Sequence, residues 1–143
     1  MFLSLISGRN PEFLIEQQVK SVSQLRNSKL EIIPTGYILI EGGNKSAVQS
    51  VSNTTPIPQS NVESIVHTAL AGQFSGKKLI YLEAGSGAQI SVSEEIISAV
   101  KKAINIPLIV GGGICSKQQL GRSYEAGADM VVIGTAFEKG EFL

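Results

Sequence analysis

The stretch Leu79-Ile80-Tyr81-Leu82-Glu83-Ala84-Gly85-Ser86-Gly87 decides the fold of this chain. An apolar run carries a tyrosine and a carboxylate two positions apart and then breaks into small residues. Side chains two apart on a strand share a face, so we expect Tyr81 and Glu83 on one face and Leu82 on the opposite, helix-packing face. The stretch therefore predicts a buried strand that ends in a loop able to wrap an anion.

Two later stretches repeat this design without the acid. Residues 108–113 read Leu-Ile-Val-Gly-Gly-Gly, and residues 130–135 read Met-Val-Val-Ile-Gly-Thr. Near-continuous apolar runs are typical of parallel strands that are buried on both faces. Sites on parallel sheets lie at the carboxyl ends of the strands, so these ends predict a phosphate site built from backbone amides. The alternative is that the glycines only form tight turns between strand and helix.

The remaining segments extend the pattern into a repeat of strand and helix, which predicts one α/β domain with a parallel sheet. After residue 133 too few residues remain for another full helix. The expected strands cover residues 2–7, 37–41, 78–83, 107–110 and 129–133, and the expected helices cover residues 11–27, 62–70, 96–104 and 116–126.

Composition limits the classes of function. The 143 residues carry 12 basic and 12 acidic side chains and no Trp, which argues against a nucleic-acid partner. The single cysteine excludes an intramolecular disulfide and indicates a cytoplasmic protein. No apolar run approaches the roughly 20 residues needed to cross a bilayer.

Several residues outside the glycine loops have two interpretations. Glu83 could accept a proton from a substrate hydroxyl, or it could cap the strand end in solvent. The polar stretch over residues 44–59 could contact or cover a substrate, or it could be a solvated loop. His67 is expected on a helix surface, and Cys115 is expected to be a buried small hydrophobic residue.

The same stretches resemble the geranylgeranylglyceryl phosphate synthase family. The resemblance rests on residues 81–88, 110–114 and 132–135, and on residues 36–43 with 52–58, which resemble the branch from bacteria and some archaea. It covers essentially the whole chain. It implies a TIM-barrel prenyltransferase of lipid biosynthesis that joins a polyprenyl diphosphate to sn-glycerol 1-phosphate, with Mg²⁺ assisting the departure of diphosphate.

The resemblance also implies roles for individual residues. Tyr81 and Glu83 would hold the glycerol phosphate, with Glu83 facing the hydroxyl that attacks. The phosphate would be cradled by the loops that follow three strands. The residues carried over for this cradle are Ala84, Gly85, Ser86, Gly87, Gly112, Gly113, Gly134 and Thr135.

The chain departs from the family in length. A TIM barrel has eight strands and about 250 residues, so we expect residues 1–143 to be a single partial barrel holding strands four to eight. The first three βα units, with the aspartate that binds magnesium, and the closing helix are expected to be absent. We therefore expect an inactive chain that self-associates through two open sheet edges. The alternatives are another phosphate-binding barrel enzyme, such as an isomerase, aldolase or flavin oxidoreductase, and a non-catalytic half-barrel.

Overall fold

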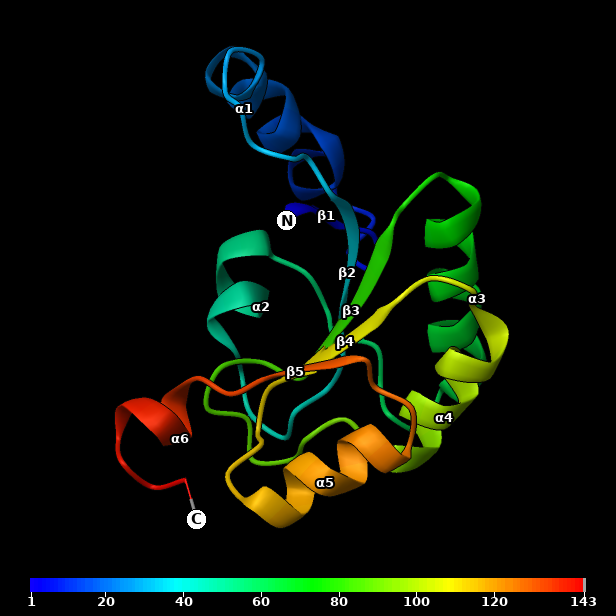
Figure 1. Ribbon diagram of the computed structural model, residues 1–143, viewed down its shortest axis with the longest axis vertical. Coiled ribbons are helices and arrows are strands. Elements are labelled where there is room, and N and C mark those ends of the chain that lie inside the picture. The colour runs from blue at the N-terminus through cyan, green and yellow to red at the C-terminus, as the bar shows by residue number, and fades with distance from the viewer. Residues whose placement is uncertain (143) are drawn as a thin grey trace.

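Five parallel strands pair in the order in which they occur along the chain, and helices alternate with them (Figure 1). The computed structural model describes residues 1–142. A sequential strand order without reversal is that of a barrel sector and not of a doubly wound sheet. The elements are β1 Phe2–Leu5, η1 Glu12–Glu16, α1 Gln17–Leu25, β2 Pro34–Leu39, α2 Ala47–Ser52, α3 Val62–Phe74, β3 Leu79–Glu83, α4 Glu94–Ala103, β4 Leu108–Gly111, α5 Lys117–Glu125, β5 Met130–Val132 and α6 Thr135–Glu138.

The predicted order of strands and helices is confirmed, with local differences. β2 begins at Pro34 and not at residue 37, because proline is tolerated as the first residue of a strand. The helix predicted over residues 11–27 opens with a π-helical turn, η1. The polar stretch over residues 44–59 contains the short helix α2, whose amino end is capped by the Ser46 hydroxyl. A four-residue helix, α6, follows β5.

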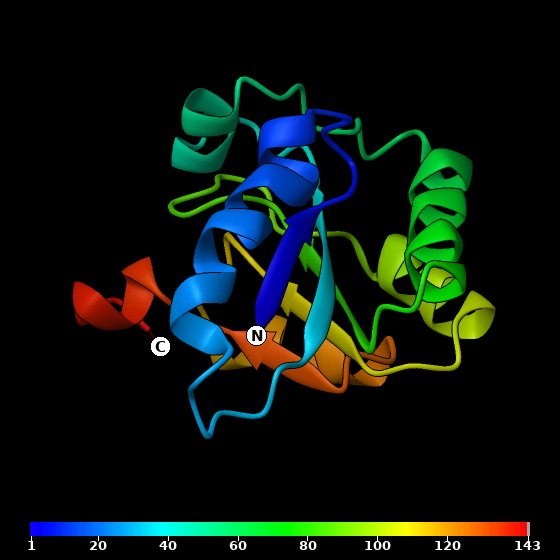
Figure 2. The same cartoon turned by 90° about the horizontal axis from the view of Figure 1, so that it is seen from above.

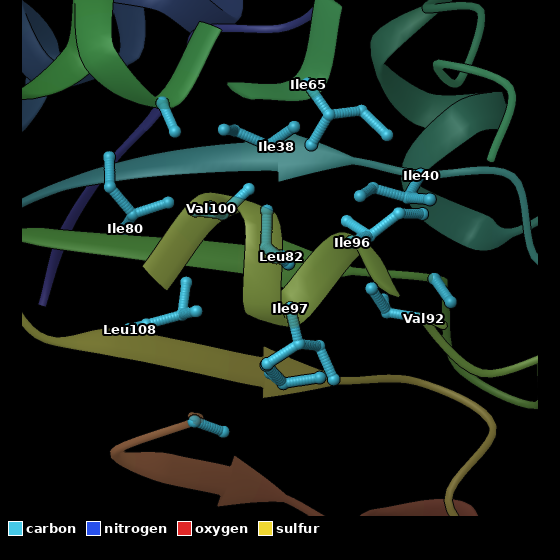
Figure 3. Close-up of a cluster of buried hydrophobic side chains, with 14 of the residues drawn as sticks. Ile38, Ile40, Ile65, Ile80, Leu82, Val92, Ile96, Ile97, Val100 and Leu108 are labelled. Atoms are coloured by element: carbon cyan, nitrogen blue, oxygen red, sulfur yellow. The ribbon is translucent and has the colours of Figure 1, made fainter. Parts of the chain in front are cut away.

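The main core lies between one face of the sheet and the helices α3 and α4 (Figure 3). Alternate strand residues such as Ile38, Ile80 and Leu82 point to these helices and are fully buried. Ile65 of α3 and Ile97 of α4 fill the space opposite them. Burial of a side chain of this size contributes roughly 1.5–3 kcal/mol, so this layer holds the strand ends in place. Leu82 thus takes the helix-packing position that the sequence predicts.

The opposite face of the sheet carries a second, smaller cluster. Leu79, Tyr81 and Ile109 are buried there, with Tyr37 packed against them. α2 and α6 lie on this side of the sheet, away from α3 and α4 (Figures 1 and 2). We call this surface the inner face, since it corresponds to the interior of a barrel. Tyr81 and Glu83 share it, as their spacing requires.

The two edge strands of the sheet, β1 and β5, differ in how far other segments cover them. η1 and α1 run along β1 (Figure 2), and the Gln18 side-chain amide donates to the Leu3 carbonyl. The Gly8 amide donates to the Leu5 carbonyl, so both carbonyls of β1 that face away from β2 are satisfied. Among residues 1–142 no strand pairs with the outer side of β5. Within residues 1–142 no strand pairs with the outer side of β1 either, so both edges lack a strand partner as expected, and η1 and α1 cover part of the β1 edge.

No helix within residues 1–142 combines the length and the apolar character that crossing a bilayer would need.

Candidate functional site

A cleft of about 310 Å³ opens at the carboxyl ends of β3, β4 and β5. This volume is in the range of small-molecule sites. The expected convergence of Glu83 with the glycine loops after β4 and β5 is observed, whereas their binding of phosphate stays a prediction. The lining residues are Glu83, Ser86, Gly87, Ala88, Gly112, Gly113, Ile114, Cys115, Val132, Gly134, Thr135, Ala136, Lys139 and Glu141.

Glu83 is the last residue of the central strand β3, and its side chain is 7% exposed. Its Oε1 accepts a hydrogen bond of 2.8 Å from the Gly85 amide. A carboxylate offers about four lone-pair sites, so this bond leaves capacity for a hydroxyl donor in the cleft. A buried carboxylate without such a partner is costly, which argues against the alternative that Glu83 caps the strand in solvent.

The lack of a side chain at Gly112 makes room for the Glu83 carboxylate. Its φ of +86° lies in the left-handed region, and a Cβ at this position would sit 2.7 Å from both Glu83 Oε1 and the Gly85 nitrogen. Only glycine fits both the backbone conformation and this close approach. The glycine after β4 is therefore required by the acid on the neighbouring strand as well as by the turn.

Tyr81 lies beneath the acid and not in the lining of the cleft. Its hydroxyl lies against the Glu83 carboxylate, and its ring packs edge-on against Tyr37 with 5.1 Å between ring centroids. Burial, and then the negative charge of Glu83, raises the pKa of both Tyr81 and Tyr37 well above the usual range of phenols. Both phenols therefore stay protonated, so the Tyr81 hydroxyl beside Glu83 remains a neutral O–H group.

The first two residues of the loop after β3 also lie behind the cleft wall. The Ala84 amide donates to the Gly111 carbonyl at 3.0 Å, and the Gly85 amide is used by Glu83. Of the residues predicted to cradle a phosphate, Ala84 and Gly85 are not brought to the lining. Ser86 and Gly87 are exposed and do line it.

Polar donors converge on the cleft from three loops. Within residues 1–142 the amides of Ser86, Gly113 and Thr135 donate to no protein acceptor. The Ser86 and Thr135 hydroxyls hydrogen-bond each other at 3.0 Å, which joins the loops after β3 and β5 across the loop after β4. Free amides and hydroxyls in such a concave arrangement bind an anion without a fixed cation.

Two charged residues of the lining were not predicted. Lys139 and Glu141 follow α6, and Lys139 is the one basic side chain among the lining residues. No periodic pattern marks the last ten residues, so only the fold of α6 places them at the cleft. The expectation for Cys115 is wrong, because the thiol is exposed at the rim of the cleft. His67 is exposed on α3 and lines a different groove, consistent with a helix-surface residue.

A second hollow, of about 840 Å³, lies between η1 and α2 on the inner face. It is mainly apolar, and it shares Tyr37 with the aromatic pair that supports Glu83. The side chains that give it apolar character are Leu3, Leu5, Phe13, Tyr37, Ala47, Val48 and Val51.

The carboxylates among the lining residues of the cleft are Glu83 and Glu141. Residues 1–142 contain no group of three His, Cys, Asp or Glu side chains that could hold an ion. One oxygen of Glu83 accepts a hydrogen bond from Gly85. Mg²⁺ is commonly held by one or two carboxylates together with substrate phosphates, so a magnesium ion at this cleft would need oxygen ligands from a bound substrate as well.

Comparisons of the sequence and of the structure both find similar proteins of one family. The sequence model of the PcrB family matches residues 1–141. The geranylgeranylglyceryl phosphate synthase of Zunongwangia profunda is 65% identical over 142 residues, which are 99% of this chain and 61% of that protein. The crystal structure of (S)-3-O-geranylgeranylglyceryl phosphate synthase from Thermoplasma acidophilum, in complex with its substrate sn-glycerol-1-phosphate, superposes with a TM-score of 0.91 at 37% identity.

The superposition covers 97% of this chain and 56% of the Thermoplasma acidophilum chain. A wild-type enzyme of the same kind from Thermoplasma volcanium gives a TM-score of 0.88 at 43% identity, over 94% of this chain and 53% of that one. The chain thus spans somewhat more than half the length of these relatives.

Proposed function

The chain belongs to the PcrB family, and we propose that it supplies the glycerol-phosphate half of a prenyltransferase site. The observation that carries the proposal is the convergence of Glu83 and three glycine-bearing loops on one cleft of about 310 Å³. The support from comparison is the Thermoplasma acidophilum relative, whose structure holds sn-glycerol-1-phosphate. We infer that the same ligand binds here, with its phosphate at the loops of Gly113 and Thr135 and its free hydroxyl toward Glu83.

The arrangement suits formation of an ether bond. The glycerol hydroxyl oxygen attacks the first carbon of the prenyl chain, the bond from that carbon to the diphosphate oxygen breaks, and diphosphate leaves. Glu83 accepts the hydroxyl proton, and its charge also opposes the positive charge that builds up on the allylic carbon. The protonated Tyr81 phenol holds the carboxylate in place for this step.

We assign the polyprenyl tail to the apolar hollow between η1 and α2. The hollow is connected to the site through packed aromatic rings, because Tyr37 lines the hollow and packs against Tyr81, which lies beneath Glu83. Most of its lining side chains are apolar, as a hydrocarbon chain requires. We propose that the diphosphate, and the magnesium that would assist its departure, bind mainly through further βα units of the barrel, since the described residues hold no group of three ligating side chains.

Binding of the small substrate tests the proposal directly. The chain is titrated with sn-glycerol 1-phosphate, sn-glycerol 3-phosphate and inorganic phosphate by isothermal calorimetry. We expect the first ligand to bind tightest, because only it places both the phosphate and the hydroxyl correctly. Equal affinity for all three would favour a general phosphate site of another barrel enzyme, and no binding of any would refute the proposal.

We further propose that residues 1–143 are one partial barrel domain of a cytoplasmic enzyme and that turnover needs additional βα units. Incubation with geranylgeranyl diphosphate, sn-glycerol 1-phosphate and Mg²⁺ should give no ether product with the 143-residue chain alone. Addition of the part of the Zunongwangia profunda relative that this chain does not cover should restore product. Turnover by the isolated chain would contradict this proposal while leaving the assignment of the cleft intact.

A further inference from the structure

The polar segment of residues 44–59 lies outside the lining of the cleft, yet its two end residues hold the cleft wall. We propose that Asn44 and Gln59 are positioning residues that brace the loop of residues 84–93. This inference rests on the proposed function, because the braced loop is the one that carries Ser86 and Gly87 to the phosphate. It assigns the segment a task other than direct contact with a substrate.

Gln59 ties three backbone groups together. Its Nε2 donates to the Glu41 carbonyl at 2.9 Å and to the Ser91 carbonyl at 3.0 Å, and its Oε1 accepts from the Ser93 amide at 3.0 Å. One amide side chain thus joins the end of the loop after β3 to Glu41, the second residue after β2. Ser93 is also the N-cap of α4, so the bond reaches the start of that helix.

Asn44 holds the middle of the same loop. Its Nδ2 donates to the Gly87 carbonyl and its Oδ1 accepts from the Gln89 amide, both at 3.3 Å. The Gly42 carbonyl adds two further acceptor contacts, from the Gln89 amide at 2.9 Å and the Ile90 amide at 3.0 Å. Gly87 lines the cleft directly, so these bonds act on the wall itself.

The two loops are in such close contact that a side chain at residue 42 does not fit. A Cβ on Gly42 would lie 2.2 Å from the Ala84 carbonyl oxygen. The segment behind the brace is itself anchored, because Ile57 pairs with the end of β2 and the Asn10 side chain donates to the Ser52 carbonyl at 2.9 Å. A folded, doubly anchored segment keeps the wall in its binding shape before the ligand arrives, which lowers the entropy lost on binding.

Three variants test the brace. Gln59→Glu keeps the acceptor for Ser93 but turns a carboxylate toward two carbonyl oxygens, and Asn44→Ala removes both bonds at an exposed position where folding is not at risk. Gln49→Ala is the control, because Gln49 belongs to the same segment and its side chain makes no hydrogen bond to residues 84–93. Each brace variant should weaken binding of sn-glycerol 1-phosphate by about fivefold to thirtyfold, the effect of losing one or two hydrogen bonds.

Amide hydrogen exchange of the ligand-free chain separates the brace from the proposed function. We expect faster exchange at residues 85–93 in both brace variants, an unchanged pattern in α3 and β3, and unfolding midpoints close to wild type. Wild-type exchange and affinity in Asn44→Ala and Gln59→Glu would overturn the inference. An effect of Gln49→Ala as large as theirs would also overturn it. Absence of glycerol-phosphate binding by the wild-type chain would instead refute the proposed function, whereas the exchange data would still show whether the loop is braced.

Discussion

Glu83→Gln is the substitution that most directly tests the chemistry of the cleft. Glutamine has the same shape, and its amide oxygen still accepts the bond that Glu83 Oε1 receives from Gly85 at 2.8 Å. The change replaces a charge-assisted hydrogen bond, worth about 1.5–3 kcal/mol, by a neutral one of about 0.5–1.5 kcal/mol. Removal of a buried charge offsets this loss, so we expect the free energy of unfolding to change by less than about 2 kcal/mol.

The Glu83→Gln change should affect binding of the glycerol hydroxyl and binding of the phosphate differently. The hydroxyl of sn-glycerol 1-phosphate loses its charged acceptor, a cost of about 1–2 kcal/mol, or roughly fivefold to thirtyfold in Kd. Inorganic phosphate makes no such bond and gains from the removal of a nearby negative charge, so its Kd should stay the same or fall. Isothermal calorimetry with both ligands measures the difference.

Glu41→Gln provides the matched control for this experiment. Glu41 also follows a strand and precedes glycine, but it is exposed and lies outside the cleft lining. Glu41→Gln should leave the affinities for sn-glycerol 1-phosphate and for inorganic phosphate unchanged. Unaltered binding of glycerol phosphate by Glu83→Gln, or an equal loss for inorganic phosphate, would refute the assignment of the hydroxyl to Glu83.

Three further outcomes are expected. Gly112→Ala should destabilise the fold by about 1–3 kcal/mol in urea unfolding, because φ at this residue is +86° and the new Cβ would meet Glu83. Gly121→Ala is the control: this glycine lies in α5 with nothing within 4 Å of the added Cβ, so the change should stabilise the fold by up to about 1 kcal/mol. A hydrogen bond from Lys101 holds the pKa of Asp129 below its usual value of 3.8. The stability that Asp129 contributes is therefore present above that value and is lost as pH falls through the lower, folded pKa. Urea unfolding at a series of acidic pH values should show a smaller loss of stability in Asp129→Asn than in the wild-type chain. We propose that the chain self-associates through the outer side of the edge strand β5, on which Met130 is 42% exposed. Met130→Lys should then lower the mass measured by light scattering, and an assembly of unchanged mass would place the contact elsewhere.

Much of the fold follows from local patterns in the sequence. Runs such as Leu79–Glu83 specify a buried strand, because period-two alternation sends Leu82 to one face and Tyr81 to the other. Glycine after each of the last three strands marks where the chain turns at the carboxyl ends. A parallel sheet brings those ends to one edge, so the convergence of Glu83 with residues 112 and 134 could be predicted without coordinates.

Only the tertiary structure decided which groups face the cleft and which support it. The sequence cannot show that the Gly85 amide turns back to Glu83, that Cys115 is exposed, or that Lys139 reaches the rim. Asn44 bonds to Gly87, 43 positions away in the chain. Loop side chains follow no period, and their partners depend on how distant segments approach one another after the core has packed. Strand and helix assignments are local properties, whereas the brace and the lining of the cleft are properties of the assembled fold.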